Sequence, residues 1–273
     1  MAALQGENQI GKFRNIVGKL VSRITTLEGV AGVVFIGGLA RGYADKYSDI
    51  DILVFLDRKD KNLRRRLRQI GAEEQKRSHI DIDLEVHFLQ DFSRWKWSEM
   101  SLWDFSHAKI VYDAHGKIRK SFNRKLRISR NFWVKRIVIY SEYLKWYCCP
   151  PKRGLETLVD AWVVRGDMVS AHYCVNYAFD LMLRVLFALN KEFLPPQKWR
   201  LFYSYSLNWL PKDYRKLVEE TMTVKSFSKR DLDRRTQALQ TMWQLTLPKI
   251  KSETGLTPKL ISKCYVEKVL HQI

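Results

Sequence analysis

The sequence has few cysteines and no long apolar run. Its four cysteines include the adjacent pair Cys148 and Cys149, and their spacing fits neither a metal site nor a disulfide framework. No stretch approaches the roughly 18–20 apolar residues of a membrane-spanning helix. The N-terminus lacks the basic and then apolar pattern of a secretory signal. We therefore expect a protein of the reducing cytoplasm, with no membrane segment.

Acidic residues are also scarce relative to basic ones. The chain has 48 Lys and Arg against 29 Asp and Glu, which gives a net charge of +19. Such a charge attracts polyanions, although scattered cations on a solvated surface would produce the same total. Two basic clusters, RRRLR (64–68) and the segment 117–130, would either follow a phosphate backbone or form solvated helix faces.

The first part of the chain, residues 1–118, has the pattern of a small α+β domain. Apolar residues recur at helical spacing over 7–27, and a polar start with a closing Gly71 indicates a second helix over 57–72. Alternation or short apolar runs predict strands. The expected strands are 30–36, the segment SDIDILVFL (48–56), 78–89 with one apolar and one acidic face, and a last strand with its exit turn in 111–120.

Residues 119–273 have a different pattern, with long segments of helical period separated by prolines. The expected helices are 130–146, 155–164, 167–189, 214–224 and 232–246. The predicted fold class is therefore α+β: a small mixed-sheet domain, 1–118, followed by an all-α helical bundle domain, 119–273.

The segment GGLARGYADKYSDIDILVF (37–55) carries most of the chemistry. Asp49 and Asp51 are two residues apart at the start of a strand, so their side chains share one face. Paired carboxylates repel each other unless a cation neutralises them, and oxygen ligands favour Mg²⁺. The acidic strand 78–89 would add Glu85 or Asp83. Gly37 and Gly38 would let the backbone turn into a short helix and approach a phosphate closely.

These residues resemble the signature of the polymerase-β-like nucleotidyltransferases, in which two glycines are followed by an aspartate pair around one apolar residue. The segment 83–88, DLEVHF, is similar to a stretch of the kanamycin- and lincosamide-type members. The resemblance implies that Mg²⁺ binds Asp49, Asp51 and a third carboxylate, Glu85, with Asp83 as the alternative. It also implies that residues 119–273 form a HEPN-like helical domain.

The implied reaction is Mg²⁺-dependent transfer of a nucleoside monophosphate, AMP from ATP, onto a hydroxyl of a small molecule, with release of pyrophosphate. Asp83, Glu85 or Asp180 would accept the hydroxyl proton. Two alternatives stay open. One is transfer to a macromolecule, either an RNA 3′ end or a protein tyrosine, and the other is a non-catalytic nucleotide-binding module of toxin–antitoxin type. The kanamycin-type resemblance also implies a homodimer.

Other candidate binding residues flank the aspartates or lie in the helical half. Arg41 would contact phosphate or face solvent, and Ser48 would donate a hydrogen bond or cap the turn. A polar stripe recurs every four residues along 167–189. It includes His172, Asn176 and Asp180. The stripe either forms an internal hydrogen-bond network or lines an acceptor site, and in the second case Lys198 would meet phosphate.

Overall fold

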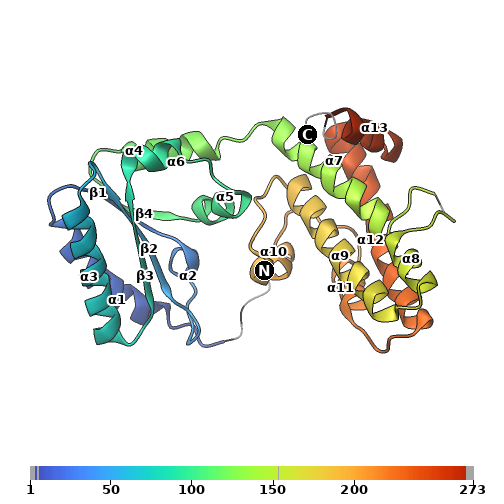
Figure 1. Cartoon of the computed structure of the whole chain (residues 1–273), viewed down its shortest axis with the longest axis horizontal. Helices are drawn as coiled ribbons and strands as arrows, with labels where there is room; N and C mark the ends of the chain where they lie inside the picture. Colours follow the sequence, from blue (N-terminus) through green and yellow to red (C-terminus); the bar gives the residue numbers. More distant parts are fainter. Residues whose placement is uncertain (1–3, 5, 153, 269–273) are drawn as a thin grey trace. The chain divides into compact units, whose positions relative to one another are not determined.

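A computed structural model describes residues 4, 6–152 and 154–268 of the chain. The chain divides into two compact units between Ile128 and Ser129, and each is shown in Figure 1. The first unit holds the sheet and the second is helical, so the predicted α+β class is confirmed. No helix among the described residues is long and apolar enough to cross a membrane.

The first unit is built on a four-stranded mixed sheet with strand order β3-β2-β1-β4. The central strand β2 pairs antiparallel with β1 and parallel with β3, and β4 pairs antiparallel with β1. The strands are β1 Val30–Phe35, β2 Ile50–Leu56, β3 Ile82–Phe88 and β4 Lys109–Asp113. The helices are α1 Ile10–Thr25, α2 Gly37–Arg41, α3 Lys61–Ser78, α4 Leu89–Arg94, α5 Glu99–Ser106 and α6 Lys117–Leu126.

Alternate side chains of β2 point to opposite faces of the sheet. Ile50, Ile52 and Val54 point into a buried core that also contains residues of α1 and α3, the two helices that cover this face of the sheet (Figure 1). Phe55 points to the other face, where its ring lies 4.7 Å from that of Phe92 in an aromatic cluster. Since Asp51 shares the parity of Phe55, it lies on the face opposite α1 and α3.

The helix α3 is longer than the sequence predicted. Gly71 does not end it, and α3 continues to Ser78, where His79 adopts a left-handed conformation with φ 56°. Gly71 instead allows the helix to approach β3, because a Cβ atom at residue 71 would lie 3.3 Å from the Cβ of Leu84. A glycine inside a helix is thus explained by close helix–strand packing.

The first unit also extends beyond residue 118. The helix α6 contacts β4 and α5, and its Ile118 is buried against Gly32 of β1. Because this contact ties α6 to the sheet, the division falls at 128/129 instead of the 118/119 that the change of sequence pattern suggested.

The second unit is a helical bundle around α9, which contacts five other helices of the unit. Its helices are α7 Arg130–Tyr147, α8 Leu158–Val164, α9 Met168–Leu189, α10 Gln197–Ser204, α11 Tyr214–Met222, α12 Lys229–Thr254 and α13 Pro258–Lys268. The predicted helices agree with α7, α8, α9 and α11. The last predicted helix ended too early at 246, since α12 continues through Pro248 to Thr254.

Candidate active site

The two glycines and the two aspartates come together at one end of β1 and β2. The Ile36 amide donates a hydrogen bond to the Asp51 carbonyl (3.3 Å). Gly37 then adopts φ +60°, and a Cβ atom there would lie 1.8 Å from Asp51 Oδ2. At Gly38 a Cβ atom would lie 2.6 Å from the carbonyl oxygen of Tyr43. Both positions therefore require glycine. A Cβ atom would collide with the Asp51 carboxylate at Gly37 and with the Tyr43 carbonyl oxygen at Gly38.

Carboxylates from β2 and β3 face one another across the parallel strand pair. Asp51 is in register with Asp83, and Leu53 with Glu85. Burial, followed by the negative charges of Asp49 and Asp83, raises the pKa of Asp51 to about 6. Burial and the charges of Glu85 and Asp49 also raise the pKa of Asp83. The sheet thus gathers these acids into one negative surface, as the alternating pattern of β3 predicted.

One further acid of the first unit had no signal in the sequence. Asp104 of α5 also raises the pKa of Asp51, while Arg41 lowers it. Arg41 Nη1 lies 3.8 Å from Asp104 Oδ1, and its side chain is only 10% exposed. Its guanidinium carbon also lies 4.7 Å from the centre of the Trp103 ring. Arg41 is therefore held beside the carboxylates instead of facing solvent.

Two other predicted site residues are bound to neighbours close in sequence. Glu85 Oε2 lies 2.8 Å from His87 Nε2. The Ser48 hydroxyl donates to Asp45 Oδ1 (3.1 Å) and accepts a hydrogen bond from the Asp45 amide (2.9 Å). Ser48 thus closes the turn that precedes β2 through its two hydrogen bonds with Asp45.

The chemistry of these donors fits a divalent cation. The acids around Asp51 offer carboxylate oxygens, the ligand type that Mg²⁺ prefers, and the negative charges of Asp49 and Asp83 add to the effect of burial in raising the pKa of Asp51. Among the described residues, no three His, Cys, Asp or Glu side chains converge closely enough to hold a metal ion. The carboxylates would therefore have to turn about their side-chain bonds to bind one together.

Comparison with known proteins identifies the first unit. Residues 11–139 match the family model described as Nucleotidyltransferase domain. Residues 11–139 form a nucleotidyltransferase domain. The predicted superfamily and the predicted enzyme class are thereby confirmed. None of the curated proteins compared with the chain matches it.

Several solved structures resemble the chain at low identity. A nucleotidyltransferase-like protein from Exiguobacterium sibiricum is 11% identical, with 88% of this chain and 78% of that chain covered and a TM-score of 0.45. Spectinomycin adenyltransferase from Enterococcus faecialis, solved with ATP and spectinomycin, is 12% identical, with 87% and 100% covered and a TM-score of 0.35. A chain of the toxin–antitoxin MntA-HpeT is 15% identical, with 47% and 96% covered and a TM-score of 0.33.

The remaining predicted residues lie outside the nucleotidyltransferase domain, on the helical unit. His172 is buried, and its Nδ1 lies 2.7 Å from Nη1 of Arg235 on α12. Arg235 also donates to Asn176 Oδ1. Asp180 accepts hydrogen bonds from Arg184 Nε (2.8 Å) and from Arg200 of α10. The polar stripe is thus an internal network that ties α9 to α10 and α12.

Lys198, the predicted phosphate contact of the helical unit, lies exposed on α10. Sequence reasoning missed the partners of the stripe, Arg200 and Arg235. Each is separated from α9 along the chain, and neither belongs to a motif, so no sequence signal was available to find them.

Proposed function

We propose that the nucleotidyltransferase domain transfers a nucleoside monophosphate, AMP from ATP, onto a hydroxyl of a small molecule. The observation that carries this proposal is the group of acids around Asp51, whose pKa is raised to about 6 by burial and by neighbouring carboxylates. Such a concentration of like charge is expected where a divalent cation and a triphosphate bind. We assign Asp49 and Asp51 to the cation. When bound, Mg²⁺ would neutralise charge on the triphosphate and orient its α-phosphate.

The third carboxylate of this proposal is Asp83. Asp83 is in register with Asp51 and interacts electrostatically with both Asp49 and Asp51. Glu85 lies two residues further along the strand pair, in register with Leu53, and contacts His87. A raised pKa also makes Asp83 a better proton acceptor. Asp180 is less suited to that role, because Arg184 and Arg200 both donate to it.

In the proposed reaction the acceptor hydroxyl attacks the α-phosphorus of ATP. A new P–O bond forms, the bond to the β-phosphate oxygen breaks, and pyrophosphate leaves. Asp83 takes the hydroxyl proton. Arg41, held beside Asp51 and Asp104, would contact the triphosphate. Gly37 keeps the start of the α2 backbone close to the Asp51 carboxylate.

A small cationic acceptor agrees best with the charge at the site. Mg²⁺ typically takes one or two carboxylates together with substrate phosphates. Five acids surround the site, namely Asp49, Asp51, Asp83, Glu85 and Asp104. The acids left over would make this region negative in a chain whose net charge is +19, which favours a cationic molecule over a polyanion as the acceptor.

The test is transfer of label from ATP carrying ³²P at the α-phosphate, with Mg²⁺ and separate sets of cationic small molecules, RNA and proteins as acceptors. We expect a labelled small molecule with the wild-type chain and none with Asp49→Asn or Asp51→Asn. Asp91→Asn, an exposed acid on α4 that pairs with Lys59, is the matched control and should transfer normally. Label on an RNA end or on a protein would replace the small-molecule acceptor, and no transfer to any acceptor would refute the enzymatic proposal.

A further inference from the structure

A basic groove lies on the nucleotidyltransferase domain away from the acidic site. It has a volume of about 870 Å³ and is lined mainly by α6 and the start of α4. Asp57, at one end of the groove, directly follows β2, whereas Asp51 is near the start of that strand. Six residues of extended chain separate the two, which corresponds to about 20 Å. None of the residues that line the groove is one of the acids around Asp51, so we treat the groove as a second site and call it the α6 groove.

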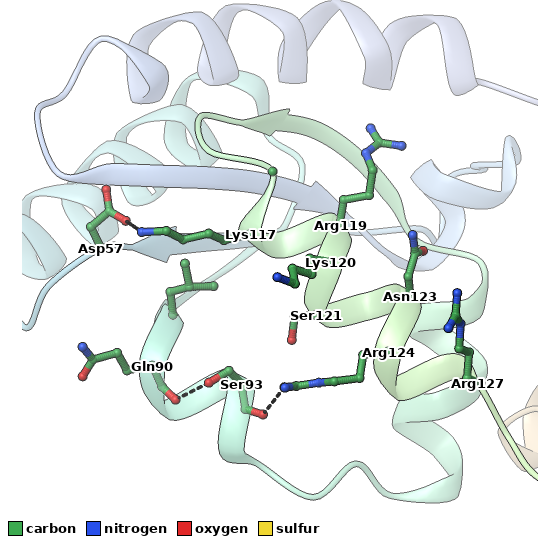
Figure 2. Close-up of a pocket in the computed structure, with 12 residues that line it drawn as sticks. Asp57, Gln90, Ser93, Lys117, Arg119, Lys120, Ser121, Asn123, Arg124 and Arg127 are labelled. Atoms are coloured by element: carbon green, nitrogen blue, oxygen red, sulfur yellow. Dashed lines mark hydrogen bonds and ion pairs between the residues drawn. The ribbon is translucent and has the colours of Figure 1, made fainter.

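Four cations of α6 line this groove, namely Lys117, Arg119, Lys120 and Arg124, together with Arg127, which directly follows the helix. Figure 2 shows Arg119 and Arg127 on one side of the helix with Asn123, and Arg124 on the side that faces α4. The helix rises about 14 Å from Lys117 to Leu126. Cations distributed over this length match a chain of phosphates better than a single phosphate group.

Few acids balance these cations. Asp57 is the one carboxylate among the residues that line the groove, and Lys117 (3.8 Å) and His115 (3.6 Å) already pair with it. Arg124 donates to the carbonyl oxygen of Ser93 (3.3 Å), which fixes its guanidinium against α4. The groove thus keeps a strong positive charge.

A buried hydroxyl in the groove has no partner among the described residues. Ser121 is 6% exposed, lies among the lining residues, and its Oγ makes no hydrogen bond to any residue that the structure describes. A buried polar group without a partner is costly. A ligand oxygen that enters between α6 and α4 would supply the missing bond, so Ser121 is a second and independent indication of a bound polar molecule.

An exposed aromatic residue beside α6 narrows the class of ligand. Trp95 follows α4 and is 46% exposed, and its carbonyl oxygen accepts a hydrogen bond from Lys125 of α6. Its ring lies next to those of His87 and Phe92. Exposed aromatic rings beside a basic groove are typical of proteins that bind single strands, because unpaired bases stack on them. A duplex keeps its bases stacked inside, and a free nucleotide would not require so long a row of cations.

We infer that the α6 groove binds the sugar–phosphate backbone of a single-stranded nucleic acid, with a base stacked on Trp95. Lys117, Arg119, Lys120 and Arg127 contact phosphates, and Ser121 donates a hydrogen bond to the backbone. This inference does not depend on which acceptor the acidic site uses. It assigns a function to the basic segment 117–130, which the transfer reaction does not need.

The test uses the full chain and fluorescein-labelled, unstructured 20-nucleotide strands of one sequence, as RNA and as DNA, with anisotropy as the readout. The variant Arg119→Gln/Lys120→Gln/Arg127→Gln removes three exposed cations of the groove. We expect its Kd to rise about tenfold or more. The slope of log K against log salt should become shallower by about 2, since each phosphate contact on a single strand contributes roughly 0.7. The tighter of the two arms identifies RNA or DNA as the ligand.

The matched control removes the same charge from the other basic cluster. Arg65, Arg66 and Arg68 are exposed on α3, so Arg65→Gln/Arg66→Gln/Arg68→Gln should leave Kd within about threefold of the wild type. Equal losses in the two triple variants would show attraction by net charge alone and overturn the inference. Failure of the wild type to bind either strand at about 0.1 M salt would also overturn it. Unchanged thermal unfolding of each variant excludes misfolding as the cause.

A second variant tests the single-strand assignment. Trp95→Leu keeps an apolar side chain against Phe92 but removes the stacking surface. We expect about fivefold weaker binding of the single strand with an unchanged salt slope, because stacking on one aromatic ring contributes at least this much. Equal or tighter binding of a blunt duplex, or complete displacement of the strand by an equimolar amount of ATP, would overturn the assignment.

Discussion

Gly37 faces the carboxylate of Asp51 so closely that a Cβ atom at residue 37 would lie 1.8 Å from Asp51 Oδ2. The backbone of Gly37 is also left-handed. An alanine there would therefore meet two penalties, one from φ and one from the collision. The position of Asp51, which binds the metal in the proposed reaction, therefore depends on glycine at residue 37.

Gly37→Ala should lower the free energy of unfolding by about 2–4 kcal/mol and abolish nucleotidyl transfer by displacing Asp51. Gly255→Ala is the matched control, because Gly255 also has positive φ (74°) but open space around its Cβ position. It should cost about 1 kcal/mol and leave transfer intact. Urea unfolding and the labelled-ATP assay measure both effects. Equal destabilisation by the two alanines would show that Asp51 moves aside freely.

The pKa of Asp51 predicts a pH-dependent stability. In the folded chain this pKa is about 6, whereas in the unfolded chain it is about 3.9. Between these values the folded state binds the proton and the unfolded state does not, so stability falls as pH rises from about 4 to 6. Asp51→Asn should remove this decline and stabilise the chain at pH 7 by about 1–2 kcal/mol, after allowance for solvent screening. If the stability of Asp51→Asn still fell between about pH 4 and 6 as in the wild type, the decline could not be due to the raised pKa of Asp51.

The assignment of the third carboxylate is tested by two conservative variants on one strand. Asp83→Asn should reduce the rate of transfer by about a hundredfold or more, since it removes both a charge at the metal and the proposed base. Glu85→Gln should reduce it less than about tenfold, because Glu85 contacts His87 and is in register with Leu53. The reverse order of effects would assign the role to Glu85, as the family resemblance implied.

Much of this site could be predicted because its determinants are close together in the sequence. The glycines, the aspartate pair and the alternating acids of β3 are local patterns, and the parallel pairing of β2 with β3 brings them together. The sequence alone could not decide whether Glu85 or Asp83 is the third carboxylate. Both lie on the same face of β3, and only the register of β3 with β2 shows which of them is opposite Asp51. Asp104 could not be predicted, because it lies on a short helix with no motif and reaches Asp51 only through the tertiary fold.

Packing between distant segments also explains the errors in the predicted elements. The sequence pattern predicts a helix end at Gly71, but the environment of Gly71 is set by Leu84 of β3. The same pattern predicts a domain boundary at 118, but Ile118 is buried against β1. In both cases the local residue type was ambiguous, and a contact far away in the chain determined the structure.

Ser121 provides a stability prediction that is independent of binding. Its buried hydroxyl makes no hydrogen bond within the part of the chain that the structure describes, and alanine is the better helix former. Ser121→Ala should therefore raise the free energy of unfolding by about 1 kcal/mol in the absence of ligand. The neighbouring Asn123→Ala, at an exposed position of the same helix, controls for helix propensity alone. An equal gain from both substitutions would mean that the hydroxyl of Ser121 carries no desolvation cost.

His172 predicts the opposite pH dependence for the helical unit. Burial and the nearby guanidinium of Arg235 lower the pKa of His172. The unfolded state therefore binds the proton first, and stability falls as pH drops below about 6.5. His172→Gln, which keeps a hydrogen-bond acceptor for Arg235, should flatten this fall. Measurement in the Asp51→Asn background separates the two effects, and an unaltered acid limb in the double variant would contradict the prediction.

The central place of β2 in the sheet has a consequence for motion at the site. Because β2 is hydrogen-bonded to β1 on one side and to β3 on the other, its amides should exchange with deuterium only when the whole first unit opens. Asp104 and Arg41 lie instead on α5 and α2, two short helices outside the sheet, whose amides should exchange sooner. The acids on the strands would then keep fixed positions. Asp104 and Arg41 would fluctuate on a faster timescale and adjust to each acceptor that enters.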